Sequence, residues 1–166
     1  MTIIDAQVHV WLPESPDRPW PPGGAARVQL PYALDYTKLL KLMDEAGASA
    51  AIRHAERSVV TVAVDQVLFL EPIHLGDLVT LQADLTFVGR TSMETRIVVT
   101  AQNLRTGQAT HTNTAYFVYV ALDDQGRPVP VPPLNLETDD ERQQWEAAQE
   151  RQAYRLSQRA RRQRQP

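Results

Sequence analysis

Two adjacent carboxylates interrupt an otherwise apolar segment of the sequence. Asp44 and Glu45 lie within residues 39–51, where leucine, methionine, alanine and glycine predominate. Burying a carboxylate alone costs much free energy, so such a group must be hydrated in a cleft, paired or hydrogen-bonded. A carboxylate at a cleft can activate a water molecule as a general base. A chemical role is therefore one interpretation of Asp44, and the alternatives are that it points into solvent or pairs with Arg53.

Three of the four histidines and one turn carry the other groups that could do chemistry. His54 follows the apolar segment, where a cationic side chain suits the end of a helix, so we expect a capping role. His74 and His111 have no partner at the spacing of metal ligands, and both are predicted to be structural. The turn Gly89–Ser92 combines an arginine with two hydroxyl side chains, which is ordinary for a hairpin but could also bind a phosphate group.

One helix and four strands are predicted to position these groups. Apolar and small residues recur at helical spacing after Asp35, which can serve as the N-cap, and they continue to about Ala51. Because they cover nearly every side, the helix is predicted to be buried. Alternating apolar and polar residues then predict strands at 60–64, 79–87, 93–101 and 110–122. This order favours an α+β fold in which a curved antiparallel sheet, connected as a meander of hairpins, wraps around the helix.

Composition divides the chain into three parts. Residues 1–34 hold six of the twelve prolines and form an N-terminal arm that is extended or irregular after a short apolar start. Residues 35–133 form the folded body, and residues 134–166 form a polar C-terminal part with a basic end. We expect the arm to lie outside the core of the body, although its apolar start could add an edge strand.

The C-terminal part is predicted to contain a helix over residues 139–162. Thr138 and Glu141 have the spacing of a capping box, in which each side chain binds the backbone of the other residue. The helix has few apolar residues, so we expect it to pack loosely.

The overall composition limits the classes of function. The chain has 166 residues, which is the usual size of one domain, and no cysteine, which excludes disulfides and thiolate chemistry. A net charge of −3 gives no general reason to expect nucleic acid as a partner, and the basic end at 159–164 is interpreted as a solvated tail. No apolar run approaches the roughly 18 residues of a membrane span, and no signal peptide is evident. We therefore expect a cytoplasmic protein that contacts no membrane.

Seven short blocks occur in an order and spacing typical of one known family. They are LLKLMDEAG at 39–47, VVTVAVD at 59–65, FLEPIHLGD at 69–77, VGRTSME at 88–94, AYFVYVAL at 115–122, GRPVPVP at 126–132 and ETDDER at 137–142. Over roughly residues 38–155 the chain resembles the hot-dog acyl-CoA thioesterases, in the branch that includes the bacterial and brain-type acyl-CoA hydrolases.

The resemblance implies a fold, a reaction and a set of site residues. The hot-dog fold wraps an antiparallel sheet around a central helix, and its members hydrolyse acyl-CoA thioesters to free CoA and a carboxylic acid with no metal or added cofactor. Asp44 matches the family's catalytic aspartate, which activates water or acts as the nucleophile. Arg90, Thr91 and Ser92 match a turn that lies near the CoA nucleotide. The family forms homodimers, which often assemble further as trimers of dimers.

The sequence departs from the family just before the predicted helix. Relatives usually carry a Phe-Gly-Gly segment there, whereas Tyr36 and Thr37 occupy the glycine positions here. Glycine allows the backbone to approach a ligand closely, which a bulky residue obstructs. The alternative interpretation is therefore a non-catalytic hot-dog protein that binds acyl-CoA or only self-associates.

The first residues also resemble the start of a different family. IIDAQVHVW at 3–11 is similar to the first strand of amidohydrolase barrels, in which a His-x-His pair binds a metal ion. Only His9 of that pair is present, because Gln7 takes the other position, and the sequence lacks the remaining barrel strands. A metal hydrolase is therefore the weakest alternative, and we expect no metal site.

Overall fold

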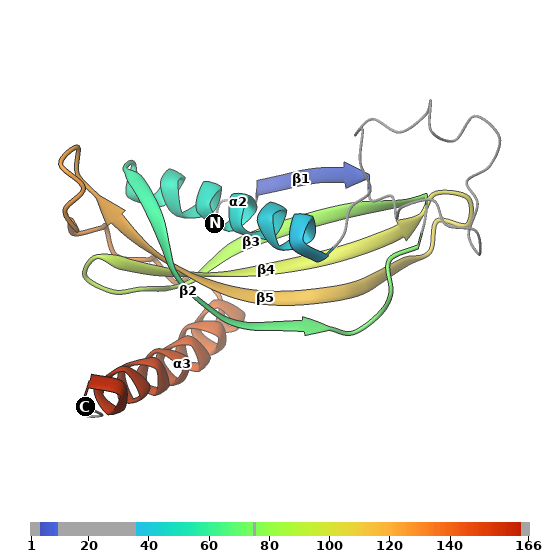
Figure 1. The fold of residues 1–166 in the computed structure, drawn as a ribbon. Helices are drawn as coiled ribbons and strands as arrows, with labels where there is room; N and C mark the ends of the chain where they lie inside the picture. Colours follow the sequence, from blue (N-terminus) through green and yellow to red (C-terminus); the bar gives the residue numbers. More distant parts are fainter. Residues whose placement is uncertain (1–3, 10–35, 75, 164–166) are drawn as a thin grey trace.

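The structure is a computed structural model that describes residues 4–9, 36–74 and 76–163. Figure 1 shows a curved sheet with one helix across each of its faces. The elements are β1 (Ile4–His9), α2 (Tyr36–Ala55), β2 (Ser58–Phe69), β3 (Asp77–Val88), β4 (Ser92–Asn103), β5 (Ala109–Leu122) and α3 (Asp139–Gln163). The helix–sheet class and the four predicted strands are confirmed, and each strand is longer than its alternation of residues indicated.

The five described strands form one antiparallel sheet in the order β1-β3-β4-β5-β2. The strands β3, β4 and β5 form the predicted meander. The prediction of hairpins throughout is wrong for β2, which pairs with β5 at the far edge and not with β3. The chain thus passes from α2 to the far edge of the sheet, and the sheet curves around the helix (Figure 1).

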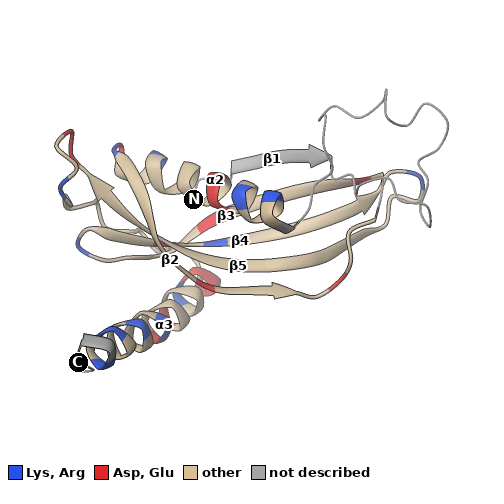
Figure 2. Ribbon diagram, viewed as in Figure 1, with Lys and Arg blue, Asp and Glu red and all other residues tan. Residues whose placement is uncertain are grey.

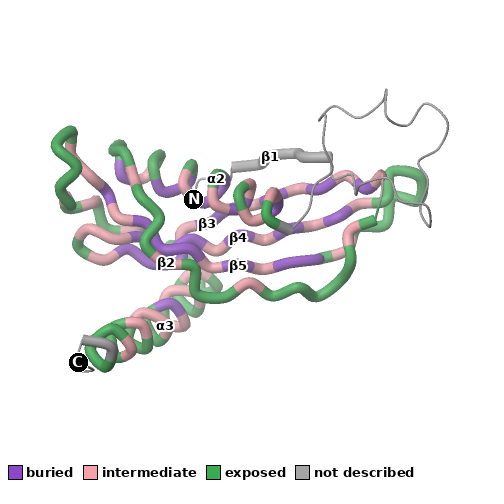
Figure 3. The backbone as a smooth tube through the Cα atoms, viewed as in Figure 1, coloured by how far each residue is buried: buried purple, intermediate pink, exposed green. Residues whose placement is uncertain are grey.

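The core lies between α2 and the middle of the sheet, where Figure 3 shows the buried residues gathered. Met43 of α2 and Ile97 of β4 are fully buried there. Gly47 allows the helix to approach the sheet closely, because a Cβ atom at that position would lie 2.5 Å from the hydroxyl oxygen of Tyr119. The predicted burial is therefore confirmed for the face of α2 that packs on the sheet and is wrong for the opposite face, where Lys41, Glu45 and Ile52 are exposed. The N-cap predicted at Asp35 lies outside the described residues.

The apolar start of the N-terminal arm is part of the sheet. β1 pairs with β3 from Ile4 opposite Ala83 to His9 opposite Leu78. The residues that resemble an amidohydrolase strand thus form a sheet edge in this fold. The sheet therefore extends beyond the segment 35–133, into the arm.

The C-terminal helix α3 begins with the predicted capping box. The backbone N–H of Glu141 donates to Thr138 Oγ1 at 3.2 Å, and the N–H of Thr138 donates to Glu141 Oε2 at 2.8 Å. The prediction of loose packing is wrong. Ala148 is fully buried, and the Trp145 ring lies 4.6 Å from the Phe87 ring. In Figure 2 the ribbon of α3 is coloured for charged residues along much of its length, and two of its arginines bind the sheet, as described below.

Candidate active site

Asp44 lies in the middle of α2 and is held by residues of two strands. Thr61 of β2 donates its hydroxyl hydrogen to Asp44 Oδ1 at 2.6 Å. Tyr119 of β5 donates to the same oxygen at 3.2 Å and lies 2.9 Å from the backbone carbonyl oxygen of Asp44. The carboxylate is therefore hydrogen-bonded and only partly buried, which is the condition that its sequence context required. It neither points freely into solvent nor pairs with Arg53.

Tyr119 is a permanent hydrogen-bond donor to this carboxylate. Its side chain is fully buried beside α2. Burial, followed by the negative charge of Asp44, raises the pKa of Tyr119 well above its usual value of 10. The phenol therefore stays protonated across the physiological range.

Thr61 and Tyr119 are the site residues that the sequence analysis missed. Thr61 is the hydroxyl residue within a run of valines on an edge strand, and Tyr119 stands at an inward position between Phe117 and Ala121. Thr61 is exposed and Tyr119 is buried, and the sequence pattern around neither residue points to Asp44. Their contact with Asp44 follows from the pairing of β2 with β5, whereas the predicted meander of hairpins would have placed β2 beside β3.

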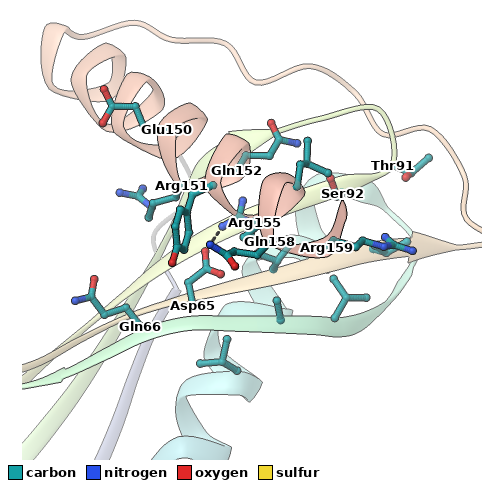
Figure 4. Close-up of a pocket in the computed structure, with 17 residues that line it drawn as sticks. Asp65, Gln66, Thr91, Ser92, Glu150, Arg151, Gln152, Arg155, Gln158 and Arg159 are labelled. Carbon is teal, nitrogen blue, oxygen red and sulfur yellow. Dashed lines mark hydrogen bonds and ion pairs between the residues drawn. The ribbon is translucent and has the colours of Figure 1, made fainter. Parts of the chain in front are cut away.

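The predicted CoA-binding turn Gly89–Ser92 lies in the hairpin between β3 and β4. Arg90 is exposed, and its carbonyl oxygen accepts a hydrogen bond from the Val131 N–H at 3.0 Å. Thr91 and Ser92 line a cavity of about 1040 Å³ between β2, β5 and α3 (Figure 4). This cavity is on the α3 side of the sheet, whereas Asp44 lies on the α2 side. The described residues of one chain therefore do not join the turn and Asp44 in one cavity.

Asp65, Arg151 and Arg155 line this cavity (Figure 4), and they form an ion network with Glu94. Glu94 of β4 is fully buried, and its two carboxylate oxygens lie 2.7 Å from Arg151 Nη2 and 2.7 Å from Arg155 Nη1. Arg155 also pairs with Asp65 of β2. Burial raises the pKa of Asp65, and the Arg155 guanidinium opposes this increase. Both arginines are thus paired with carboxylates of the sheet, and these ion pairs bind α3 to the sheet.

The histidines of the described residues make structural contacts. His54 Nε2 lies 2.8 Å from the carbonyl oxygen of Pro132, so its ring binds a distant loop, and the prediction that it caps its own helix is wrong. His74 Nδ1 lies 3.7 Å from Asp77 Oδ2, and His111 Nε2 lies 2.8 Å from Thr114 Oγ1, so the structural roles of these two histidines stay a prediction. Within the described residues, no three His, Asp or Glu side chains are grouped to hold a metal ion. Neither described helix is long and apolar enough to cross a membrane.

Comparison with known proteins identifies the family. Residues 36–108 match the model of the thioesterase superfamily. The chain is 40% identical over 104 residues to the uncharacterized acyl-CoA thioester hydrolase YkhA of Bacillus subtilis, which covers 63% of this chain and 60% of that protein. A hexameric acyl-CoA thioesterase in its apo form has a TM-score of 0.76 and 32% identity, covering 95% of this chain and 93% of the other. An acyl-CoA hydrolase of Staphylococcus aureus, in complex with CoA compounds, has a TM-score of 0.77 and 26% identity over 97% of this chain and 90% of the other.

The chain belongs to the thioesterase superfamily and has its hot-dog fold. The sequence match spans about 60% of the length of YkhA and 65% of the next curated relative, the Helicobacter pylori protein VdlD.

Proposed function

We propose that this protein hydrolyses acyl-CoA thioesters and that Asp44 activates the attacking water. The observation that carries the proposal is the 2.6 Å hydrogen bond from Thr61 to the Asp44 carboxylate. The S. aureus hydrolase has been studied as variants in which one aspartate and one threonine, seventeen positions apart, were each replaced by alanine. Asp44 and Thr61 are also seventeen positions apart. An asparagine fifteen positions before that aspartate was replaced as well, and Gln29 has this spacing here, outside the described residues.

The proposed reaction needs only the substrate and water. A carboxylate oxygen of Asp44 takes one proton from water while the water oxygen forms a bond to the thioester carbonyl carbon. The carbon–sulfur bond of the resulting tetrahedral intermediate then breaks, and the CoA sulfur leaves with the bonding electron pair. Asp44 returns the proton to the sulfur, which gives free CoA and a carboxylic acid. In direct attack, an Asp44 oxygen would bond to the acyl carbon while the carbon–sulfur bond breaks and the CoA thiolate leaves, which gives a mixed anhydride. Water would then hydrolyse the anhydride to the carboxylic acid and free Asp44, and the proton released would convert the thiolate to CoA.

The decisive experiment is CoA release from a panel of acyl-CoAs by the wild type and by Asp44→Ala. General-base catalysis is typically worth about 100- to 10,000-fold, so we expect a loss of kcat in that range. Glu45→Ala is the matched control, because Glu45 is the exposed neighbouring carboxylate on the same helix. Unchanged turnover of Asp44→Ala would remove Asp44 from the mechanism. A wild type that binds acyl-CoA without turnover would favour the non-catalytic alternative that the Tyr36–Thr37 substitution suggested.

We propose further that Arg90, Thr91 and Ser92 bind the CoA phosphates. The exposed guanidinium of Arg90 and the two hydroxyls beside it can bind phosphate oxygens through charge-assisted hydrogen bonds. Such contacts act equally in the ground state and in the transition state, so Arg90→Ala should raise KM with nearly constant kcat. The reverse pattern would place Arg90 away from the nucleotide.

The proposed functional unit is an assembly of identical chains, with a homodimer as its base and a trimer of dimers as a further candidate. No described strand pairs with the outer edge of β2, and Val60, Val62 and Val64 on that strand are 44–55% exposed. An unpaired apolar edge strand favours association with another strand. Three solved structures that are similar to this chain are described as hexameric. Light scattering should therefore give a mass well above the 18.7 kDa of one chain, and a monomer at micromolar concentration would contradict this proposal.

The cellular location is proposed from a relative. The chain is 36% identical over 109 residues to a rat acyl coenzyme A thioester hydrolase that is named as cytosolic. This supports a cytoplasmic location, which fractionation of cells expressing the native protein would test.

A further inference from the structure

We infer that Tyr119 is a positioning residue that holds one oxygen of Asp44, so that the other oxygen, Oδ2, receives the proton of the water. This inference rests on the proposed function and extends it to a residue on the opposite strand of the site. It assigns different tasks to the two oxygens of a single carboxylate.

The geometry separates the two carboxylate oxygens. Thr61 of β2 donates to Oδ1 at 2.6 Å, and the single hydroxyl hydrogen of Tyr119 is shared between Oδ1 at 3.2 Å and the backbone carbonyl oxygen of Asp44 at 2.9 Å. Within the described part of the chain, no residue donates a hydrogen bond to Oδ2. Both donors thus engage Oδ1, whereas Oδ2 keeps its lone pairs for an incoming proton. Oδ2 is therefore the oxygen that can act as the base.

Tyr119 is suited to a fixed orienting role. It is fully buried, so its ring cannot rotate away, and its raised pKa keeps the hydroxyl hydrogen in place. The same hydroxyl lies 2.9 Å from the backbone carbonyl oxygen of Asp44. Tyr119 thus contacts both the backbone and the side chain of one residue, which restricts rotation of the carboxylate about its side-chain bonds.

A glycine on the helix makes room for this contact. A Cβ atom at position 47 would lie 2.5 Å from the Tyr119 hydroxyl oxygen and 2.7 Å from Thr95 Oγ1. Both distances are shorter than real atoms allow, so any side chain at this position would displace the hydroxyl. Gly47 and Tyr119 therefore form one arrangement, and a change at either residue should disturb Asp44 in the same way.

The experiment compares Tyr119→Phe with Tyr116→Phe in CoA-release assays. Tyr116→Phe is the matched control, because it removes a hydroxyl from the opposite face of the same strand, where the ring packs against Arg151. Loss of a hydrogen bond to a charged group corresponds to a change of about tenfold to a hundredfold. We expect Tyr119→Phe to lower kcat by that factor with KM changed less than twofold, and Tyr116→Phe to leave both constants near the wild-type values.

Two further variants separate positioning from general packing. In an Asp44→Ala background, assayed at high enzyme concentration, Tyr119→Phe should lower the residual rate less than twofold, because the group on which it acts is absent. Gly47→Ala keeps the phenol but displaces it, so it should also lower kcat, and by a smaller factor when Tyr119→Phe is already present. If Tyr119→Phe fails to fold, Gly47→Ala in the wild-type and in the Asp44→Ala background provides the same test.

The possible results distinguish this inference from the proposed function. Wild-type kcat in Tyr119→Phe, or an equal loss with and without Asp44, would overturn the role of Tyr119 while leaving Asp44 as the base. Normal turnover of Asp44→Ala would overturn the proposed mechanism itself, and the positioning role with it.

Discussion

The ion network beneath α3 gives a sharp prediction about stability. The perturbation is Glu94→Gln, which keeps the shape of the side chain and removes its charge. Glu94 is fully buried and is shared by Arg151 and Arg155, whose side chains are 23% and 19% exposed. Removing one partner from a buried ion pair typically costs 3–5 kcal/mol, because the remaining charge stays buried without compensation.

The structure places the expected loss at the low end of that range. Arg155 keeps its pair with Asp65, and the Arg151 guanidinium keeps its contact with the Tyr116 ring at 4.0 Å. The carbonyl oxygen of the new glutamine can also accept one of the lost hydrogen bonds. We therefore expect a decrease of about 3 kcal/mol in the free energy of unfolding.

Urea denaturation at a fixed protein concentration measures this loss. With a slope of about 2 kcal/mol per molar urea, the midpoint should fall by about 1.5 M. Glu45→Gln is the control, because it makes the same substitution in the exposed pair with Lys41, whose side chains are 77% and 58% exposed. The control should cost less than about 0.5 kcal/mol. A loss below about 1 kcal/mol for Glu94→Gln would show that α3 is not held by the network, and the reasoning from buried charge would be refuted.

Three further predictions concern the site, the β5 turn and the arm. Thr61→Val should lower kcat about tenfold and Thr61→Ser should restore most of it, because only the hydroxyl bonds to Asp44; equal activity of both variants in a CoA-release assay would contradict this. The backbone N–H of Arg127 lowers the pKa of Asp123 below its usual value of 3.8, so the stabilisation from Asp123 is complete above that pH and is lost as the pH falls through the lowered pKa. The difference in unfolding free energy between wild type and Asp123→Asn should therefore shrink below pH 3.8, and a difference that grows on acidification would be inconsistent with this linkage. A chain beginning at Gln29 should still melt cooperatively but aggregate more readily, because removing β1 exposes the edge of β3; loss of cooperative melting would show that the arm is integral to the core.

The sequence predicts the elements of this fold better than their contacts. Alternation of residues identifies β3, β4 and β5, and apolar residues on every side identify α2, because burial dictates both patterns locally. The pairing of β2 with β5 joins two strands that are not consecutive in the chain, and no local sequence pattern indicates such a pairing. The prediction of loose packing for α3 missed the contribution of polar side chains. In the sequence, Arg151 and Arg155 look like part of a solvent-exposed helix face, and only the structure shows that both pair with the buried Glu94.

The same division applies to the candidate site. The apolar helix drew attention to Asp44 and Glu45 because a carboxylate there requires a physical explanation, and the family resemblance then selected Asp44. Thr61 and Tyr119 could not, because a hydroxyl within a strand has no unusual cost until the strand register brings it to the carboxylate. Arg90, Thr91 and Ser92 are found on the predicted turn, and their binding role stays a prediction.

The close contact at Gly47 sets a limit on how far this protein can be stabilised. Glycine in the interior of a helix costs about 1 kcal/mol relative to alanine, so position 47 would ordinarily be a first choice for a stabilising substitution. Here the added methyl group would displace the hydroxyl that contacts Asp44. The helix therefore retains a weak point in its own backbone beside the proposed catalytic aspartate. Selection for thermal resistance should change other positions of α2 and leave this one unaltered.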